Sequence, residues 1–358
     1  MRSWFRRYLL PGLVFQSICI AGGYGTGREL VEFFLQYGPV GGLLGMLPAT
    51  LIVSATCMIG FELARMFRTY DYRSFLKVLL GRGWFIYEIA YLTAILLILA
   101  VIGSATGTVL TETFQVPGIL GTIMLLGLIA FLAFWGTGLI ENFLSAWSFI
   151  LYGVYLGLFL LSIYSFGPAI MNAVTTHAAE PGWFLSGTRY GALQLALLPA
   201  ILFATAHIKE RREALIAGAL AGPLLMIPAA LFFFAMLAHY PAILERPVPV
   251  NYILQMLGST TLLILFPIVL IGTFIETGTG MIHAFNERIA GGLDAIGKTL
   301  PDFARPIIAA ALIVSALLLS RWGIIELIAV GYTAMTWVFI GIIVVPLLTI
   351  GLWKVARK

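Results

Sequence analysis

The residues whose types and spacing could do chemistry centre on a glycine-rich stretch, Gly-Gly-Tyr-Gly-Thr-Gly at positions 22–27, inside the first long apolar segment. Each glycine in a helix interior costs about 1 kcal/mol relative to alanine, so we expect the helix to be interrupted here. At bilayer depth, unpaired backbone groups are tolerated only where they are buried in protein or line a cavity. The stretch therefore predicts a site lined by free amides and carbonyls. Close helix packing through small residues is the alternative.

Two charged residues, Arg28 and Glu29, follow this stretch directly. A charge at bilayer depth costs at least ~2.5 kcal/mol on insertion scales, so the arginine needs a partner or an aqueous cavity. Two interpretations stay open. Arg28 forms a structural ion pair with Glu29, Glu32 or Glu276, or it binds an anionic group of a solute, such as a carboxylate, at the start of a half-helix.

A polar stripe on a later apolar segment supplies further candidates. Its members recur at intervals of three and four residues, which places them on one helix face: Thr273, Glu276, Thr277, Gly280, His283 and Glu287. Glu276 is the acid that we expect either to coordinate Na⁺ with nearby hydroxyls and carbonyls or to carry a proton. A buried ion pair with Arg28 is the alternative. The predicted ion-coupling group is Ala21, Gly22, Tyr24, Thr273, Glu276 and Thr277.

The composition determines what kind of element must position these residues. The chain has 358 residues, of which 61% are hydrophobic and 10% are charged. Such a composition excludes a soluble globular domain and a disordered chain, and apolar runs of about 20 residues predict membrane-spanning helices. The predicted class is an all-α integral membrane protein. Cys19 and Cys57 both lie in apolar segments, so no disulfide framework is expected.

Ten spans are predicted from the apolar runs, at 9–37, 40–64, 84–111, 118–136, 142–166, 189–207, 213–238, 254–285, 304–320 and 323–352. With a cytoplasmic amino terminus, this arrangement places 17 of the 21 Lys and Arg residues on the cytoplasmic side. The positive-inside rule thus supports ten spans with both termini cytoplasmic. The net charge of +5 therefore reflects topology, and no nucleic-acid partner is expected.

The chain divides at its midpoint into a first five-helix repeat (1–166), an extracellular connecting loop (167–188) and a second five-helix repeat (189–358), all within one membrane domain. An odd number of spans in each half forces opposite orientations. Related halves would form a 5+5 inverted repeat, whose binding site lies where the first helix of each half is broken. Pro199 is the expected break in the sixth helix because proline removes an amide donor. The predicted substrate-binding group is Gly22, Gly23, Tyr24, Gly25, Thr26, Gly27, Arg28, Pro199 and Phe203.

A family resemblance is carried by residues 21–34, Ala-Gly-Gly-Tyr-Gly-Thr-Gly-Arg-Glu-Leu-Val-Glu-Phe-Phe. This segment resembles the glycine-rich motif, with its following polar residue, glutamate and aliphatic–Phe-Phe run, of the YkvI-like uncharacterised membrane proteins. That group is similar to the amino acid–polyamine–organocation transporters with the LeuT fold. The resemblance implies a LeuT-like fold with helices 1 and 6 broken and, by position, a sodium site near Thr277. This chain has Arg28 where the family usually has Gln.

These observations predict a secondary active transporter in the cell (inner) membrane. Its solute is expected to be small, polar or anionic, and amino-acid-like, with Na⁺ or H⁺ as the coupling ion and no cofactor. An ion channel, or a ligand sensor on the same fold that does not transport, are the alternatives. An enzyme is not expected, because the sequence lacks His-Glu-x-x-His, Gly-x-Ser-x-Gly, Cys-x-x-Cys and Gly-x-x-x-x-Gly-Lys motifs. The expected partners are the solute and the lipid bilayer. Nothing in the sequence indicates the oligomeric state.

Overall fold

A computed structural model describes residues 2–20, 22–135, 138–294, 297–301 and 303–357. Within these ranges every regular element is helical, as the sequence predicts. The first half contains α1 (Arg2–Tyr8), α2 (Leu10–Cys19), α3 (Gly22–Thr26), α4 (Arg28–Phe33), η1 (Leu35–Tyr37), α5 (Gly38–Phe67), α6 (Tyr72–Leu80), η2 (Gly81–Gly83), α7 (Trp84–Phe114), α8 (Gly118–Trp135) and α9 (Gly138–Thr176).

The second half begins with α10 and runs to the carboxyl terminus. It contains α10 (Trp183–Gln194), η3 (Leu195–Thr205), α11 (Arg211–Leu237), η4 (Ala242–Glu245), α12 (Pro249–Leu257), α13 (Thr260–Asp294), α14 (Ala304–Ser320), α15 (Ile324–Glu326), η5 (Leu327–Tyr332), α16 (Thr333–Phe339), η6 (Ile340–Val344), η7 (Leu347–Gly351) and α17 (Leu352–Ala356).

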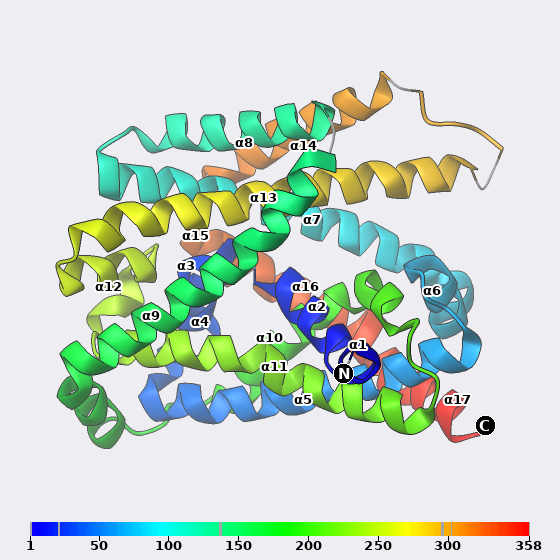
Figure 1. The fold of residues 1–358 in the computed structure, drawn as a ribbon, viewed down its shortest axis with the longest axis horizontal. Coiled ribbons are helices and arrows are strands. Elements are labelled where there is room, and N and C mark those ends of the chain that lie inside the picture. Colours follow the sequence, from blue (N-terminus) through cyan, green and yellow to red (C-terminus); the bar gives the residue numbers. More distant parts are fainter. Residues whose placement is uncertain (1, 21, 136–137, 295–296, 302, 358) are drawn as a thin grey trace.

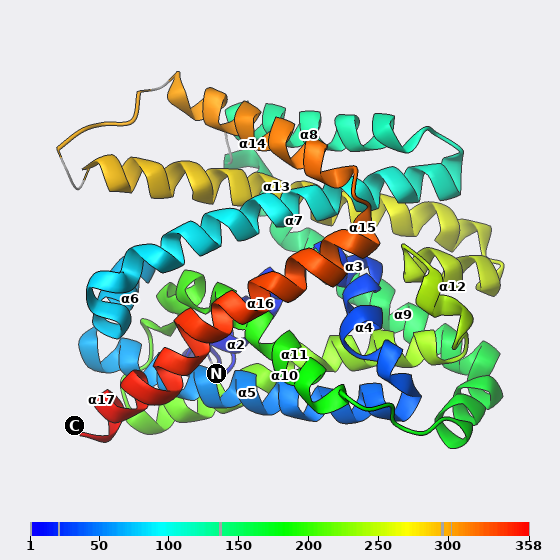
Figure 2. The same ribbon diagram turned by 180° about the vertical axis from the view of Figure 1, so that it is seen from behind.

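The long helices form two layers that enclose the short broken ones. Helices α7, α8, α13 and α14 pack together in one layer, and α5, α10 and α11 pack in the other (Figure 1). Helix α9 crosses the layers diagonally on one side, and the run from α15 to α17 crosses them on the opposite side (Figure 2). Helices α2, α3 and α4 lie between the layers. The carboxyl terminus lies at one end of the molecule, and the amino terminus lies in the same half but nearer the middle (Figure 1).

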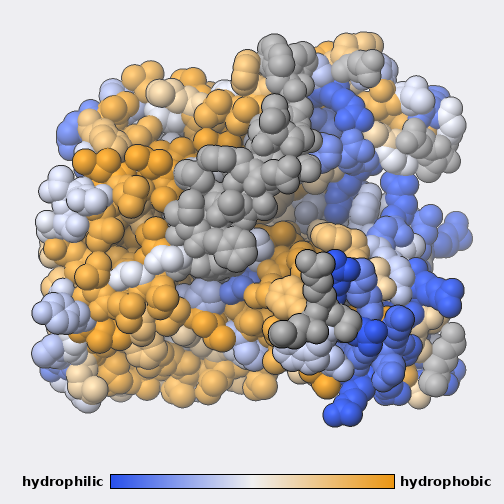
Figure 3. Space-filling model, viewed as in Figure 1, coloured by the Kyte–Doolittle hydropathy of each residue, from blue (hydrophilic) through white to orange (hydrophobic). Residues whose placement is uncertain are grey.

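Many of these helices present an apolar exterior. In the described residues, six helical segments are long and apolar enough to cross a membrane: Arg28–Phe67, Tyr72–Phe114, Gly153–Thr176, Arg211–Leu237, Thr260–Leu293 and Ile324–Ala356. Three further apolar helices, Leu10–Cys19, Gly118–Leu132 and Ala304–Ser320, are shorter. Large side chains such as Leu51 and Met124 are about two-thirds exposed. Figure 3 shows an extensive apolar surface between hydrophilic residues at its two ends, with the most hydrophilic ones at the right of the view. The predicted count of ten spans stays a prediction.

The first predicted helix is interrupted, but not in the manner expected from its glycines. Residues 22–26 form one short turn of helix, α3, and the interruptions flank it. On one side the backbone at Ile20 is non-helical and Gly22 has a φ of +31°; on the other, Gly27 adopts a left-handed conformation with a φ of +83°. Glycine occupies these backbone conformations without the strain that a Cβ would add.

Two predicted segments require correction, and a third changes its helix type where an interruption was predicted. Helix α9 continues past a kink at Phe166 to Thr176, so residues 167–176 of the expected loop are helical and only 177–182 connect α9 to α10. The expected span 254–285 is divided at Gly258, where α12 has ended, and α13 then extends to Asp294. The sixth segment changes at Leu195 from an α-helix to a 3₁₀-helix that contains Pro199, which agrees with the predicted interruption of that segment.

Candidate functional site

Helices α3 and α4 position the side chain that lies at the centre of the site. The turn between them is closed by the Thr26 hydroxyl, which donates to the Gly23 carbonyl at 2.8 Å and accepts from the Arg28 amide at 3.2 Å. After Gly27 the chain turns, and the carboxyl group of Glu29 folds back against Gly23. A Cβ on Gly23 would lie 2.7 Å from Glu29 Oε1, so a glycine at this position makes room for the carboxylate.

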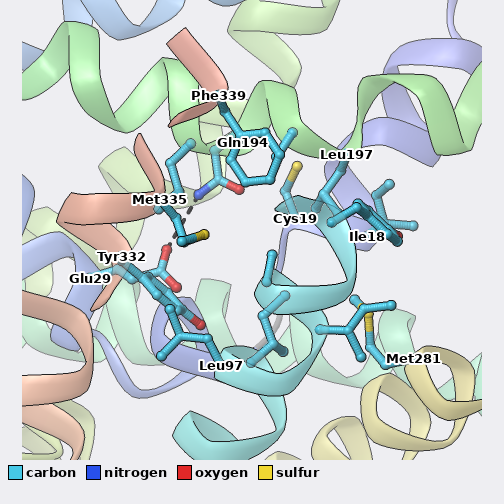
Figure 4. Close-up of a pocket in the computed structure, with 16 residues that line it drawn as sticks. Ile18, Cys19, Glu29, Leu97, Gln194, Leu197, Met281, Tyr332, Met335 and Phe339 are labelled. Carbon is cyan, nitrogen blue, oxygen red and sulfur yellow. Dashed lines mark hydrogen bonds between the residues drawn. The ribbon is translucent and has the colours of Figure 1, made fainter. Parts of the chain in front are cut away.

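Glu29 is buried between the two interrupted helices. Its side chain is 4% exposed, and Gln194, at the end of α10, donates from Nε2 to Glu29 Oε2 at 3.3 Å (Figure 4). The backbone amide of Tyr24 also donates to this carboxylate. Both donors are neutral. The hydrogen bond thus joins the start of α4, just after the interruption at Gly27, to Gln194, the last residue of α10 before the 3₁₀-helix η3.

A small cavity of about 50 Å³ lies beside Glu29 and Gln194. Because one water needs about 10–15 Å³ by this measure, the cavity has room for only a few non-hydrogen atoms. Figure 4 shows the two polar side chains facing apolar groups from several helices. The lining side chains include Cys19, Leu97, Tyr332, Met335 and Phe339. Tyr332 ends a π-helical segment, η5, an irregularity that is frequent at functional sites.

A second cavity, of about 270 Å³, lies next to the first. The two share four lining residues, Ile18, Tyr91, Leu197 and Met281. Glu276 lines the second cavity and carries the only charged side chain among its lining residues in the described part of the chain. The two carboxylates therefore line neighbouring cavities, Glu29 the small one and Glu276 the larger one.

The structure brings together part of the predicted ion-coupling group. Thr273, Glu276 and Thr277 line the second cavity together with Ile20, the residue before Ala21. Ala21 itself lies outside the described residues. Gly22 and Tyr24 line neither cavity: Gly22 faces the side chains of Val101, Ile102 and Tyr332, and Tyr24 is fully buried.

The predicted substrate-binding group is dispersed. Phe203 lines the second cavity and is 61% exposed, whereas Pro199 is buried in η3 without lining either cavity. Gly23 contacts Glu29, and Thr26 is buried within its own turn. The Gly25 carbonyl accepts a hydrogen bond from the Tyr155 hydroxyl at 3.1 Å, which ties α3 to α9.

Arg28 points away from the cavities. Its Nη1 donates to the carbonyls of Leu244 at 2.6 Å and Arg246 at 3.2 Å, and its Nη2 pairs with Glu32 at 3.2 Å. Adjacent residues of a helix project about 100° apart, which is why Arg28 and Glu29 diverge. Of the expected ion-pair partners the structure shows Glu32, and neither Glu29 nor Glu276. The ion-pair interpretation of Arg28 thus holds with Glu32 as the partner, and the alternative pairing of Glu276 with Arg28 is not seen.

These contacts predict a structural effect of changing Arg28. Removing one partner of a buried ion pair typically costs about 3–5 kcal/mol because the other charge is left uncompensated. We expect Arg28→Gln to lower the apparent melting temperature of the purified protein in a thermal-unfolding assay, while solute affinity stays within about threefold of wild type. Arg321→Gln, a change of an exposed arginine, is the matched control. A selective loss of solute affinity at unchanged melting temperature would contradict this structural role.

The sequence hypothesis did not assign a solute- or ion-binding role to Glu29, Gln194 or Tyr332. For Glu29 a signal existed: it is the acid immediately after the interruption. The hypothesis considered it only as a partner for Arg28. Gln194 and Tyr332 carry no comparable signal, because a single amide or phenol within an apolar helix does not reveal which element it faces.

No protein-family model matches the chain. A curated relative, the uncharacterized membrane protein YkvI of Bacillus subtilis (strain 168), is 22% identical over 324 residues, which cover 89% of each chain. The predicted resemblance to YkvI-like membrane proteins is thereby confirmed. Among solved structures, the Eremococcus coleocola manganese transporter superposes with a TM-score of 0.59 at 16% identity, covering 97% of this chain and 78% of the transporter.

A Na⁺-coupled sialic acid symporter in a substrate-bound outward-open state superposes with a TM-score of 0.52 at 13% identity, covering 94% of this chain and 84% of the symporter. At these identities the similarity shows the fold, which is that of LeuT-fold-like transporters. Both structural neighbours are transporters rather than enzymes, in agreement with the lack of catalytic motifs in the sequence.

Proposed function

We propose that the chain is a secondary active transporter that moves a small polar solute by alternating access, with Na⁺ or H⁺ as the coupling ion. The observation that carries this proposal is the buried contact between Glu29 and Gln194, which come from two interrupted helices and line a common cavity. Interrupted helices that meet at a cavity are the usual site architecture of secondary transporters. The transporter fold of the structural neighbours supports the same conclusion.

The proposal includes a topology of ten spans. These are α2–α4, α5, α7, α8, α9, α10–η3, α11, α13, α14 and α15–α17. The first five and the last five would form the two inverted repeats, one within 1–166 with the α9 extension and one within 189–358. Both termini would face the cytoplasm from the inner membrane, which fits their position in the same half of the molecule (Figure 1).

In this topology the described conformation faces the cytoplasm. The second cavity is lined by Val14 and Ser17 of α2 and by Gly280 and Ala284 of α13. Gly280 and Ala284 lie in the carboxyl-terminal half of α13, which runs toward the end of the molecule where the carboxyl terminus lies (Figure 1). Figure 3 shows a hollow between the layers at this end, with hydrophilic residues around it. We thus assign the second cavity to an inward-facing path that leads from the cytoplasm toward Glu29.

The charge of the solute depends on which side chains reach it. An anionic solute was expected because of Arg28, and that guanidinium is bound by Glu32 and two loop carbonyls outside the cavities. The proposed solute is therefore small and polar, without a preference for an anion.

The coupling ion is proposed to bind at Glu276 with Thr273 and Thr277. Glu276 has no ion pair among the described residues, so its carboxylate is available to an ion in the second cavity. We expect Glu276→Gln to abolish the stimulation of uptake by a Na⁺ or pH gradient, while the protein is still produced in folded form. Uptake by proteoliposomes with and without each gradient measures this. Gradient stimulation at the wild-type level would exclude Glu276 as the coupling residue.

The same proteoliposomes test the function itself. A panel of labelled amino acids, amines and small carboxylates is supplied outside the vesicles, with and without gradients. Saturable uptake that a gradient stimulates is expected of a secondary transporter. Flux without saturation would identify a channel, and binding without flux would identify a sensor, so either result would overturn the proposal.

A further inference from the structure

Helix α6 lies at the end of the molecule where the carboxyl terminus lies (Figure 1, Figure 2). Gly81, with a φ of +58°, ends the helix, so that the chain turns before α7 begins. Phe75, Leu76 and Leu79 form the buried face of α6, and the helix contacts α7 and η3. Lys77 lies on another face and is exposed. The helix is therefore amphipathic, and one of its faces is open to the surroundings.

This open face holds two cations beside one tryptophan. Arg73 and Lys77 are four residues apart, which places them on the same side of α6. The guanidinium carbon of Arg73 lies 5.2 Å, and Nζ of Lys77 lies 5.7 Å, from the ring centre of Trp84. Arg73 Nη1 also donates to the Gly291 carbonyl at 2.8 Å, which fixes the guanidinium against α13. Two positive charges are thus held near one ring at the start of α7.

These two charges have no acidic partner in the part of the chain that the structure describes. Neither Arg73 nor Lys77 forms an ion pair there. Two acids of α6 and α7 are engaged otherwise, since Asp71 caps the first turn of α6 and Glu88 pairs with Arg288 at 3.1 Å. Like charges four residues apart destabilise a helix. The uncompensated pair therefore favours an anion from outside the chain.

The neighbouring surface is apolar, which favours a lipid over a soluble anion. Phe85 and Ile86 follow Trp84 directly and are about half exposed, and Ile89, one turn later, is 62% exposed. In a membrane protein such an exposed apolar strip meets acyl chains, and tryptophan is enriched at the level of the lipid headgroups. Basic clusters beside a membrane helix attract anionic lipids. The cations and the apolar strip thus match the two parts of an anionic phospholipid.

We propose that α6 and the first turn of α7 form a binding site for an anionic phospholipid. Its phosphate binds Arg73 and Lys77 beside Trp84, and its acyl chains lie along Phe85 and Ile86. In the topology proposed above, the lipid belongs to the cytoplasmic leaflet. None of these five residues lines either cavity, so the site is independent of the solute and of transport.

Trp84 itself reports on the occupant of this site, because brominated acyl chains quench tryptophan fluorescence on contact. The full-length protein is reconstituted in phosphatidylcholine vesicles that contain an equal fraction of either brominated phosphatidylglycerol or brominated phosphatidylcholine. The fluorescence that wild-type protein has and Trp84→Phe lacks is the signal of Trp84. We expect phosphatidylglycerol to be preferred at Trp84 by roughly tenfold, because each basic residue near a membrane surface contributes about fivefold.

A matched pair of variants separates a site from general attraction to a basic surface. Lys77→Gln changes an exposed side chain and is expected to lower the preference about fivefold. Arg212→Gln, which removes the same charge from an exposed residue at the start of α11, is expected to leave the preference unchanged.

Three outcomes would overturn the proposal. Equal quenching of Trp84 by the two brominated lipids in wild-type protein would do so without requiring Lys77→Gln or Arg212→Gln to fold. Equal losses of preference in Lys77→Gln and Arg212→Gln would show a general attraction instead of a site. Loss of the preference on addition of inorganic phosphate would identify a soluble anion as the occupant. None of these outcomes depends on solute uptake, so the transporter proposal stands or fails separately.

Discussion

Glu29→Gln is expected to reduce solute uptake by about 100-fold while leaving the folded protein intact. Hydrogen bonds to a charged group contribute about 1.5–3 kcal/mol, which corresponds to roughly 10–150-fold in an equilibrium constant. Glutamine has nearly the same volume as glutamate. Its carbonyl oxygen can still accept from Gln194 and from the Tyr24 amide, so α3 and α4 keep their contacts. What the variant loses is the negative charge and the capacity to bind a proton.

Two comparisons make this result specific to the site. Initial rates of uptake into proteoliposomes are measured for Glu29→Gln, Glu276→Gln and Glu287→Gln at matched amounts of monodisperse protein. We expect Glu287→Gln to behave as wild type and Glu276→Gln to lose gradient stimulation but keep solute binding. If Glu29→Gln transports at more than about half the wild-type rate, the cavity beside Gln194 is not the solute site.

The role of Glu29 marks the limit of what the sequence could predict. Composition and apolar runs were sufficient for an all-helical membrane protein, because hydrophobic length directly determines which segments can cross a bilayer. The helix interruptions near Gly22 and Pro199 were also predictable, since glycine and proline act on the local backbone. Which charged side chain faces the cavity depends instead on how α4 is rotated after Gly27. Arg28 and Glu29 are adjacent, so a rotation by one residue would exchange their positions.

The prediction for the glycine run failed for the same reason, because tertiary contacts cannot be read from the local sequence. The glycine run was expected to leave its backbone free, but tertiary contacts stabilise residues 22–26 as a helical turn, among them the hydrogen bond from Tyr155 to Gly25. Propensity is a weak prior that such contacts override. Conversely, the stripe of Thr273, Glu276 and Thr277 on α13 was recognised because it repeats with helical spacing, and all three residues line the second cavity.

Gly187→Ala is expected to lower the stability of the protein by forcing α10 away from α5. Gly187 and Gly191 on α10, like Gly218 and Gly222 on α11, are spaced four residues apart and contact α5. Such spacing permits close backbone approach between membrane helices. A Cβ on Gly187 would lie 1.9 Å from the Gly45 carbonyl oxygen, and because that atom belongs to the backbone of α5 it cannot move aside as a flexible side chain would.

The two helices must then separate, which also displaces Gln194 at the end of α10 and so disturbs its bond to Glu29. Overpacking of this kind costs about 1–3 kcal/mol, occasionally more, and we expect the upper part of that range here because the contact is between backbones. Thermal unfolding and the yield of monodisperse protein on size-exclusion chromatography measure the effect. Gly157→Ala on α9 is the matched control, since nothing lies within 4 Å of its Cβ and alanine favours the helix. Equal melting temperatures for the two variants would show that α10 does not pack against α5 as closely as the structure places it.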